Sequence, residues 1–314
     1  MKICFIGSVG HVGQAYAEMK NHPQAEFVGA APGSSHETAL QSIQEPLPYY
    51  PDYRRMLDET KPDVAVLSPV YGLTGSIAME CARRGIHVFA EKPIAATPEE
   101  LDALEAAVRE SGIRVCAMHY LRFTPAFFEA EKLIRGGAIG DIRMVTAQKS
   151  YKFGTRPDWY WDDTLYPGII PWVGIHVIDC IYHLTGRKFT GVRAVQSGSG
   201  PQNAALCQFT MEDGIIASVN MDFLRPADAP SHEDDRIRVA GTEGVIEVRD
   251  QKICLINGEG TREIEPGPAP SLGLDFLLNR QACTNEDIFA VTRAAVTAQR
   301  SAAINQTMEI RGSV

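Results

Sequence analysis

A glycine-rich turn near the N-terminus constrains the fold more than any other feature of this sequence. The apolar run KICFI leads directly into the turn GSVGHVG at residues 7–13, and a helical pattern follows to about residue 21. Glycines at a strand-to-helix junction let the backbone approach a pyrophosphate, whose charge is then met by the helix N-terminus. The spacing is GxxGxxG rather than GxGxxG, so the turn alone also fits a connection that binds no ligand. The candidate cofactor-binding residues of this turn are Gly7, Ser8, Val9, Gly10, His11 and Val12.

The first 118 residues alternate between short apolar runs and stretches of helix length; the runs are KICFI, EFVGAA, DVAVLS, IHVFA and RVCAM. This alternation is typical of repeated βαβ units in a doubly wound parallel sheet. The clearest helix is predicted from about residue 97 to 111, because Thr97 can cap it, Pro98 suits its first position and Glu100 completes a capping box. The sequence therefore predicts an α/β Rossmann domain over residues 1–120.

A different pattern begins after residue 120. A helix is predicted from about Pro125 to Arg135, and strand-like runs then follow one another, with Asp213-Gly214 and Asn257-Gly258 at positions typical of hairpin turns. An Ala-rich helical pattern begins at Asn285. The sequence therefore predicts an α+β domain over residues 121–314, an open and predominantly antiparallel sheet with helices on one face. The uncovered face needs a partner, so we expect a homodimer or homotetramer.

Charge and composition exclude some classes of partner. The formal net charge is −9, whereas a surface that binds nucleic acid or anionic lipid needs a basic face. The sequence shows neither a signal-type cleavage site nor an apolar stretch long enough to cross a bilayer. Its 7 cysteines are scattered, without a CxxC pair, and are predicted to be reduced core residues. We expect a cytoplasmic protein with a small-molecule partner, no nucleic acid and no membrane.

The segment after the second apolar run bears on the choice between NAD and NADP. A site that prefers NAD usually has Asp or Glu here to bond the ribose hydroxyls, but residues 31–36 contain no acid. Ser34 and Ser35, with His36 beside them, could accommodate a 2′-phosphate. The sequence therefore slightly favours NADP, with an ordinary surface loop as the competing interpretation.

A lysine follows the fourth apolar run, in the turn Glu91-Lys92-Pro93. Ligands of open α/β sheets bind at the carboxyl ends of the strands, where this turn and Ser68-Pro69 after the third run are predicted to lie. A lysine at this edge can hold a substrate oxygen and stabilise negative charge on it. Lys92 is therefore the first catalytic candidate, and a solvated loop lysine is the alternative. Further cofactor-binding candidates at this edge are Ser68, Pro69, Glu91 and Lys92 itself.

A second candidate site is the run PWVGIHVIDCIYHL at residues 171–184. Helical spacing would place Trp172, His176, Asp179 and His183 on one stripe. A histidine there could act as general acid and base with a carboxylate to orient it, or it could be a packed structural histidine. A metal site on this stripe is conceivable, but the sequence offers no further ligand cluster and we predict no metal.

These landmarks, in this order, resemble the glucose-fructose oxidoreductase/inositol dehydrogenase (Gfo/Idh/MocA) family over nearly the whole chain. The matching segments are the glycine turn, Glu91-Lys92-Pro93, Arg122-Phe123-Thr124-Pro125, Gly140-Asp141-Ile142, residues 174–179 and Leu184-Thr185-Gly186. The resemblance implies a Rossmann domain and an open-sheet domain, a nicotinamide cofactor, and sugars or polyols as substrates. It also implies that Lys92 and His176 work together: His176 moves the hydroxyl proton and Lys92 stabilises the oxygen during hydride transfer.

The sequence departs from the family at one position that matters for the reaction. The family has an aspartate four residues before the histidine, and this chain has Trp172 there. An indole cannot relay a proton, but it offers an apolar face for stacking on a sugar or nicotinamide ring. The reaction could therefore be altered, slow or lost, unless another carboxylate substitutes. The candidate substitutes are Asp162, Asp163, Asp234 and Asp235, and the candidate substrate-binding residues are Arg122, Trp161, Trp172, Asp179 and His232.

The sequence thus favours an NAD(P)-dependent dehydrogenase or reductase that acts on a carbohydrate-like alcohol or ketone. Two alternatives stay open because of Trp172. One is a redox-neutral lyase or glycosidase in which bound NAD oxidises the sugar transiently. The other is a sensor that binds sugar or dinucleotide without turnover.

Overall fold

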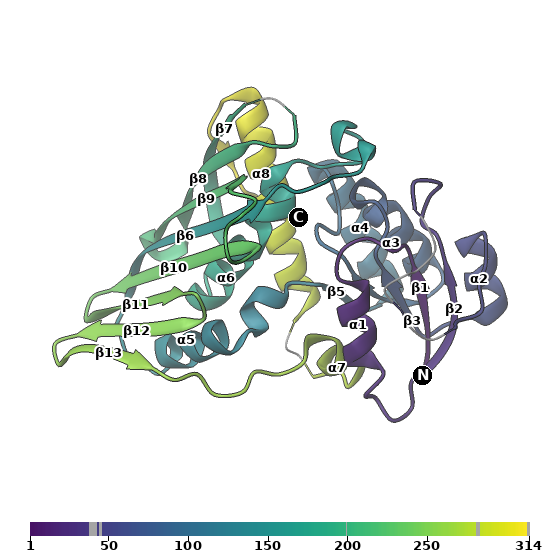
Figure 1. The fold of residues 1–314 in the computed structure, drawn as a ribbon, viewed down its shortest axis with the longest axis horizontal. Coiled ribbons are helices and arrows are strands. Elements are labelled where there is room, and N and C mark those ends of the chain that lie inside the picture. The colour runs from purple at the N-terminus through teal and green to yellow at the C-terminus, as the bar shows by residue number, and fades with distance from the viewer. Residues whose placement is uncertain (38–42, 44–45, 199, 281–282, 313–314) are drawn as a thin grey trace. The chain divides into compact units, whose positions relative to one another are not determined.

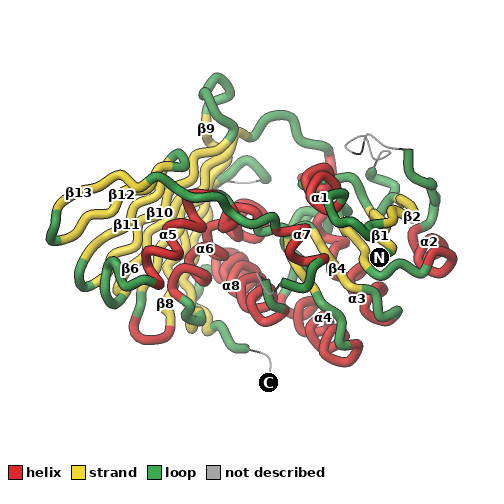
Figure 2. The backbone as a smooth tube through the Cα atoms, turned by 90° about the horizontal axis from the view of Figure 1, so that it is seen from below, coloured by secondary structure: helices red, strands yellow, loops and turns green. Residues whose placement is uncertain are grey.

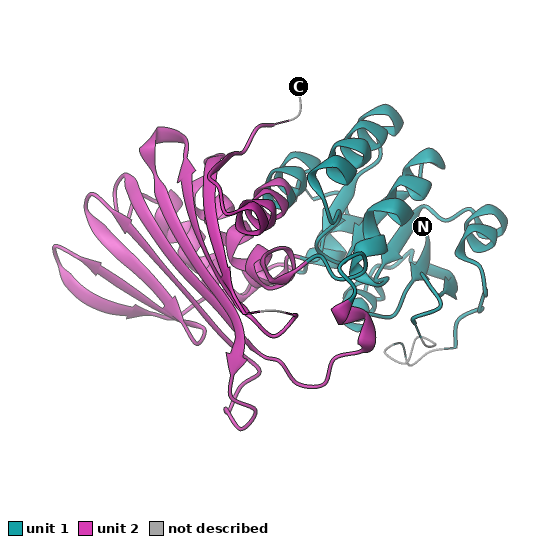
Figure 3. Cartoon of the chain, turned by 90° about the horizontal axis from the view of Figure 1, so that it is seen from above, with its two compact units in different colours: residues 1–118, 162–167, 271–292 teal, residues 119–161, 168–270, 293–314 magenta. Residues whose placement is uncertain are grey.

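The computed structural model describes residues 1–314 except 38–42, 44–45, 199, 281–282 and 313–314. The chain forms two compact units (Figure 3). The first comprises residues 1–118, 162–167 and 271–292, and the second comprises residues 119–161, 168–270 and 293–314. The sequence-based division places everything after residue 120 in one domain, whereas two later segments belong with the first unit.

Hydrogen bonds explain why these two segments belong with the first unit. The backbone N–H of Gly72 donates to the carbonyl of Leu165 at 2.8 Å. Farther along the chain, the Arg114 guanidinium donates to the carbonyl of Phe276 at 2.6 Å, and the side chain of Asn285 accepts from the N–H of Val115 at 2.8 Å. Local sequence patterns do not encode contacts over such separations.

The first unit contains a five-stranded parallel sheet with strand order β2-β1-β3-β4-β5. Its strands are almost entirely apolar because helices cover both faces of a doubly wound sheet. The order reverses direction between β1 and β3, and ligands bind at such a switch point, outside the carboxyl ends of the strands. The elements are β1 (Lys2–Ile6), α1 (Val12–Met19), β2 (Glu26–Ala31), α2 (Tyr53–Thr60), β3 (Val64–Leu67), α3 (Thr74–Arg83), β4 (His87–Ala90), α4 (Pro98–Ser111), β5 (Val115–Ala117) and α7 (Leu272–Leu277), with a short 3-10 turn at Tyr71–Leu73.

Helix α4 forms where its terminal residues predict it. The hydroxyl of Thr97 accepts from the N–H of Glu100 at 3.1 Å, and the Glu100 carboxylate accepts from the N–H of Ala96 at 2.7 Å. Gly112 ends the helix in the left-handed conformation with φ of 67°. Both ends of this helix are therefore determined by local chemistry.

The second unit contains a nine-stranded sheet with order β13-β12-β11-β10-β6-β9-β8-β7-β14. All its neighbouring strands run antiparallel except β6 and β9. Helices α5 and α6 lie along one face (Figures 1 and 2), and the prediction of an open sheet with helices on one face is confirmed. The strands are β6 (Ile142–Lys152), β7 (Phe189–Ser197), β8 (Ala204–Met211), β9 (Ile216–Arg225), β10 (Glu233–Gly241), β11 (Gly244–Arg249), β12 (Lys252–Asn257), β13 (Gly260–Ile264) and β14 (Met308–Glu309).

The helices of the second half include α5 (Pro125–Arg135), α6 (Ile175–Thr185) and α8 (Asn285–Ile304), whose residues are shared between the units. Short 3-10 turns lie at Tyr120–Phe123, Asp158–Trp161 and Glu212–Gly214. The turn at Asp213-Gly214 has φ of 58° and 72°, as predicted for its hairpin. In the β12–β13 hairpin the left-handed residue is Gly260, with φ of 117°, rather than Asn257 or Gly258.

All seven cysteines are free thiols. None of the described helices has the length and apolar character that a membrane span requires.

Candidate active site

Three loops of the first unit meet at the carboxyl edge of its sheet. The N–H of Val9, in the glycine turn, donates to the carbonyl of Ser68 at 2.8 Å, and the N–H of Glu91 donates to the carbonyl of Leu67 at 2.7 Å. Residues from the ends of β1, β3 and β4 are thereby joined at the switch point. The sequence-predicted residues Ser68 and Pro69 lie against this turn.

Glycine is required at position 7 of the turn. Gly7 has φ of +88°, and a Cβ atom there would lie 2.2 Å from the carbonyl oxygen of Ser68. The N–H of Gly7 also donates to the carbonyl of Ala31 at 2.9 Å, which joins the turn to the end of β2. Because the turn carries no side chain here, the backbone can approach a pyrophosphate closely.

The carboxylate of Glu91 holds the second half of the turn. It is fully buried and accepts from the N–H of His11 at 2.6 Å, and it also pairs with the His11 ring. A Cβ at Gly10 would meet this carboxylate at 2.1 Å. Burial alone would raise the pKa of Glu91, but His11 and Lys92 beside it, together with hydrogen bonds from His11, lower it. Glu91 is therefore ionised, and its carboxylate holds the glycine turn in place through its contacts with His11.

Lys92 follows Glu91 at the end of β4. Its side chain is 1% exposed, its N–H donates to the Glu91 carboxylate at 2.9 Å, and the peptide bond to Pro93 is cis. A buried cation at the carboxyl edge of the sheet can stabilise an oxygen that gains negative charge. These features fit the binding of a nicotinamide dinucleotide. They are the two glycines without a Cβ atom, the N-terminus of α1 and the buried lysine.

The segment after β2 contains hydrogen bonds to an acid that the sequence-based interpretation did not use. Ser34 donates from its hydroxyl to the carboxylate of Glu37 at 3.3 Å, and the same hydroxyl accepts from the N–H of His36 at 3.2 Å. Sequence reasoning passed over Glu37 because it comes six residues after the last residue of β2. The signal that could have found it is the turn-forming composition of residues 32–35, which can fold an acid back to the strand end.

In the second unit, the predicted helix over residues 171–184 begins with a π-helical turn. Ile170–Gly174 is π-helical, and α6 starts at Ile175. Pro171 lies in the first turn of this stretch, where a missing N–H costs no hydrogen bond, and π turns are frequent at functional sites. The expectation of one continuous α-helical stripe through Trp172 is therefore wrong. His176 is 3% exposed in the first turn of α6, and Trp172 is 7% exposed.

Asp179 lies in a buried ionic cluster. Its carboxylate is 2.8 Å from the His119 ring and 3.3 Å from the Arg122 guanidinium, and it is fully buried. Arg122 also contacts the His183 ring at 3.1 Å, and His183 pairs with Glu131 at 2.7 Å. These contacts link the 3-10 turn at Tyr120–Phe123 with α5 and α6. The geometry favours a structural role for Asp179 and Arg122, and their assignment to substrate binding stays a prediction.

The pKa of Asp179 leads to a prediction about stability. Burial raises this pKa, but the charges of Arg122 and His119 outweigh burial and hold it below the ordinary value of 3.8. A depressed pKa stabilises the folded state above the unfolded-state pKa, and this stabilisation is lost as the pH falls through the folded-state value. Replacing Asp179 with asparagine removes the negative charge that compensates the buried positive charge of Arg122. We expect it to cost about 3–5 kcal/mol near pH 7.

The measurement is the urea midpoint of both proteins between pH 7 and pH 3. The difference between them should begin to shrink below about pH 4, where the carboxyl of the unfolded state takes up a proton, and should shrink further as the pH falls toward the lower native pKa. The control is Asp213→Asn, which removes an exposed pair with Arg187 and should cost less than about 1 kcal/mol. Equal losses in the two variants would contradict a buried structural role for Asp179.

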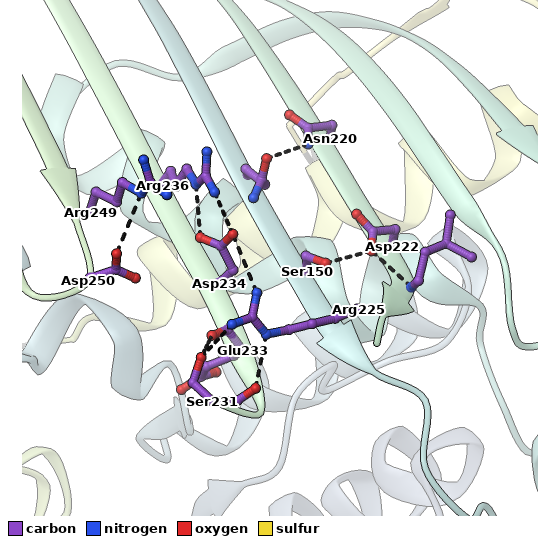
Figure 4. A network of polar contacts seen from close by, with 12 residues as sticks. Ser150, Asn220, Asp222, Arg225, Ser231, Glu233, Asp234, Arg236, Arg249 and Asp250 are labelled. Carbon is purple, nitrogen blue, oxygen red and sulfur yellow. Dashed lines mark hydrogen bonds and ion pairs between the residues drawn. The ribbon is translucent and has the colours of Figure 1, made fainter. Parts of the chain in front are cut away.

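The sheet separates the two acidic residues of β10 that were candidates for the missing carboxylate. Asp234 pairs with Arg236 at 2.6 Å and Arg225 at 3.5 Å (Figure 4). By strand alternation it lies on the face opposite the buried Ile237 and Val239. Asp235 faces the other way and pairs with Lys149 at 2.6 Å. Strand alternation alone decides this difference. Asp235 is therefore the candidate that shares the helix-covered face.

Lys149 is the centre of a second buried ionic cluster, which includes Asp235. It is 2% exposed and also pairs with Glu233 at 2.8 Å, and its ammonium lies 4.8 Å from the centre of the Tyr151 ring. Burial raises the pKa of Asp235 to about 6, although Lys149 opposes it. His232 stacks on Tyr151 with ring centres 5.0 Å apart, next to this cluster. Sequence reasoning singled out His232 but missed Lys149.

The remaining candidates lie in the aromatic-rich loop. Trp161 is 58% exposed and contacts Phe153 edge to face, with ring centres 6.2 Å apart. Asp162 accepts from the N–H of Thr164 at 2.8 Å and from its hydroxyl at 2.6 Å, so its carboxylate is used in a local turn. Among the residues that the structure describes, no three His, Cys, Asp or Glu side chains are grouped to hold a metal ion.

Comparison with known proteins places this architecture in a family. Residues 1–119 match the oxidoreductase family with an NAD-binding Rossmann fold, and residues 127–247 match the GFO/IDH/MocA C-terminal domain. A solved structure from Thermotoga maritima is 38% identical, has a TM-score of 0.93, and the match covers 99% of this chain and 100% of that one.

Two curated dehydrogenases match parts of the chain. Levoglucosan dehydrogenase from Pseudarthrobacter phenanthrenivorans is 32% identical over 152 residues, 46% of this chain and 38% of that protein. Scyllo-inositol 2-dehydrogenase (NADP(+)) IolW from Bacillus subtilis is 33% identical over 177 residues, 54% of this chain and 49% of that protein. The matches thus span less than half the length of either relative. The two family models and the Thermotoga structure nevertheless cover both units, and the chain belongs to the GFO/IDH/MocA family of oxidoreductases.

Proposed function

We propose that this protein is an NAD(P)-dependent oxidoreductase that transfers hydride between nicotinamide and an alcohol or ketone carbon of a carbohydrate-like substrate. The observation that carries the proposal is the carboxyl-edge site of the first unit, where Gly7 and Gly10 form the turn at the switch point and the buried Lys92 follows β4. The substrate class is supported by the two relatives, which are dehydrogenases of levoglucosan and scyllo-inositol.

The residues of the chain take distinct roles in this reaction. The dinucleotide, when bound, supplies the hydride chemistry, and the protein supplies position and electrostatic field. Lys92 stabilises negative charge on the substrate oxygen. His176 takes the hydroxyl proton in the oxidative direction and returns it in the reductive direction. These two assignments rest on the family resemblance and on the buried positions of both side chains.

Because Trp172 replaces the family's aspartate, two alternative functions remain as proposals. Where the family has an aspartate, an indole provides a stacking surface but no second proton acceptor. A redox-neutral lyase or glycosidase with transient oxidation would retain its cofactor and turn over without net change in reduced nicotinamide. A sensor would bind sugar or dinucleotide without turnover.

The oligomeric state and location also stay proposals. We propose a homodimer or homotetramer that buries the face of the nine-stranded sheet opposite α5 and α6, because large apolar side chains are exposed on that sheet. They are Met144, Val195, Leu206, Ile216 and Leu224. The seven free thiols support a reducing, cytoplasmic location.

The proposed function is tested first by binding and then by turnover. Purified protein freed of cofactor is titrated with NADH and NADPH, and nicotinamide fluorescence excited through energy transfer from tryptophan is followed. We expect saturable binding of at least one nucleotide, followed by oxidation or reduction in a screen of sugars and polyols. A folded protein that binds neither nucleotide would overturn the proposal in favour of a binding role.

A further inference from the structure

Glu37 lies in the loop after β2, six residues beyond the end of that strand. Its carboxylate accepts from the N–H of Gly33 at 3.0 Å and from the N–H of Val70 at 3.0 Å. The backbone N–H of Ser8 also contributes a hydrogen bond to it. These three donors follow β2, β3 and β1, which are neighbours in the sheet. One carboxylate therefore gathers backbone donors from the carboxyl ends of all three strands at the switch point.

The surroundings hold the side chain of Glu37 in place. A Cβ atom at Gly33 would lie 2.5 Å from Cβ of Pro69 and 2.9 Å from the carboxylate itself, so the loop after β2 packs closely against the loop after β3. The hydroxyl of Ser34 adds a further hydrogen bond at 3.3 Å. Ser34 is one of the two serines, with Ser35, that the sequence suggests for a 2′-phosphate, and its hydroxyl already donates to an acid.

The chemistry of this position separates NAD from NADP. In Rossmann sites the adenosine ribose lies beside the end of the second strand, where an acid accepts from the ribose hydroxyls of NAD. A 2′-phosphate at the same place meets a like charge, which weakens its binding and is a common way to exclude a wrong ligand. The N–H donors that could hold such a phosphate are also in use by the carboxylate.

We propose that Glu37 is the residue that makes this site select NAD over NADP. The acid that is missing directly after β2 reaches the same edge from the loop, through the turn in which the N–H of Glu37 donates to the carbonyl of Ser34 at 3.4 Å. This inference rests on the proposed function, and it opposes the preference for NADP that residues 31–36 suggest on their own.

The test compares dissociation constants of NADH and NADPH for the full-length protein and its Glu37→Gln variant by nicotinamide fluorescence. Titrations at pH 8 keep the carboxyl ionised, since burial raises the pKa of Glu37 against the opposing hydrogen bonds from Gly33 and Val70. We expect the wild-type protein to bind NADH at least about tenfold more tightly. The glutamine variant should narrow this ratio by about tenfold or more, chiefly through tighter binding of NADPH.

Two further variants show whether the preference depends on the charge of residue 37, on the length of its side chain, or on any loss of an acidic residue. Glu37→Asp keeps the charge and should keep the preference for NADH. Glu59→Gln changes an exposed acid of α2 and should leave both constants unaltered. A wild-type preference for NADPH, or an equal change for both nucleotides in Glu37→Gln, would overturn the role of Glu37 while leaving the proposed function intact. Failure to bind either nucleotide would overturn both.

Discussion

Replacing Lys92 with methionine is expected to lower turnover about a thousandfold while the protein stays folded and still binds reduced dinucleotide. The removal of one preorganised donor to a developing negative oxygen costs about 10²–10³ in kcat. The side chain is almost fully buried, and methionine fills a similar space without leaving a buried unpaired ammonium. Glu91 keeps its hydrogen bonds from His11, so the glycine turn should survive.

The measurement is kcat with the carbohydrate that gives the highest turnover, alongside the fluorescence titration with the preferred nucleotide. Lys252→Met is the matched control, because Lys252 is 72% exposed on the sheet of the second unit. Its turnover should equal that of the wild type. If Lys92→Met retains turnover within tenfold of the wild type, the lysine does not contact the reacting oxygen. Parallel loss of nucleotide binding and turnover would instead indicate that Lys92 mainly supports the turn.

Replacing Gly7 with alanine is expected to destabilise the protein by about 3–5 kcal/mol and to abolish dinucleotide binding. The new methyl group would lie 2.2 Å from a backbone oxygen of Ser68, and φ of +88° is strained for any L side chain. A backbone atom cannot move aside as a flexible side chain can, so the two loops must separate. Separation of the turn from β3 removes the close approach that a pyrophosphate requires.

Gly85 provides the matched control for this prediction. It also has a left-handed φ, +69°, but a Cβ atom there would meet nothing within 4 Å. Gly85→Ala should therefore show the conformational strain alone, about 1–2 kcal/mol, with nucleotide binding unchanged. Thermal and urea unfolding followed by circular dichroism measure both variants. Equal destabilisation of the two would show that the contact with Ser68 contributes nothing beyond strain.

The sequence by itself determined the elements whose chemistry is local. Thr97, Pro98 and Glu100 begin α4, and Gly112 ends it, because capping needs only neighbouring residues. The alternation of apolar runs determined the parallel sheet, and the glycine turn identified the carboxyl edge where a dinucleotide fits. The order of short motifs indicated the family, because each motif marks a local junction that the fold requires.

Only the tertiary structure decided which distant residues meet. Glu37 reaches the N–H groups of Gly33 and Val70 because β2 and β3 flank β1 in the sheet, and Asp179 pairs with His119 through packing of separate elements. Such contacts depend on strand order and side-chain direction over long separations, which no local periodicity encodes. The same reason explains why residues 162–167 and 271–292 belong with the first unit. Local hydrogen bonding and periodicity thus determine where helices and strands form. Long-range packing determines which of their residues meet in the site.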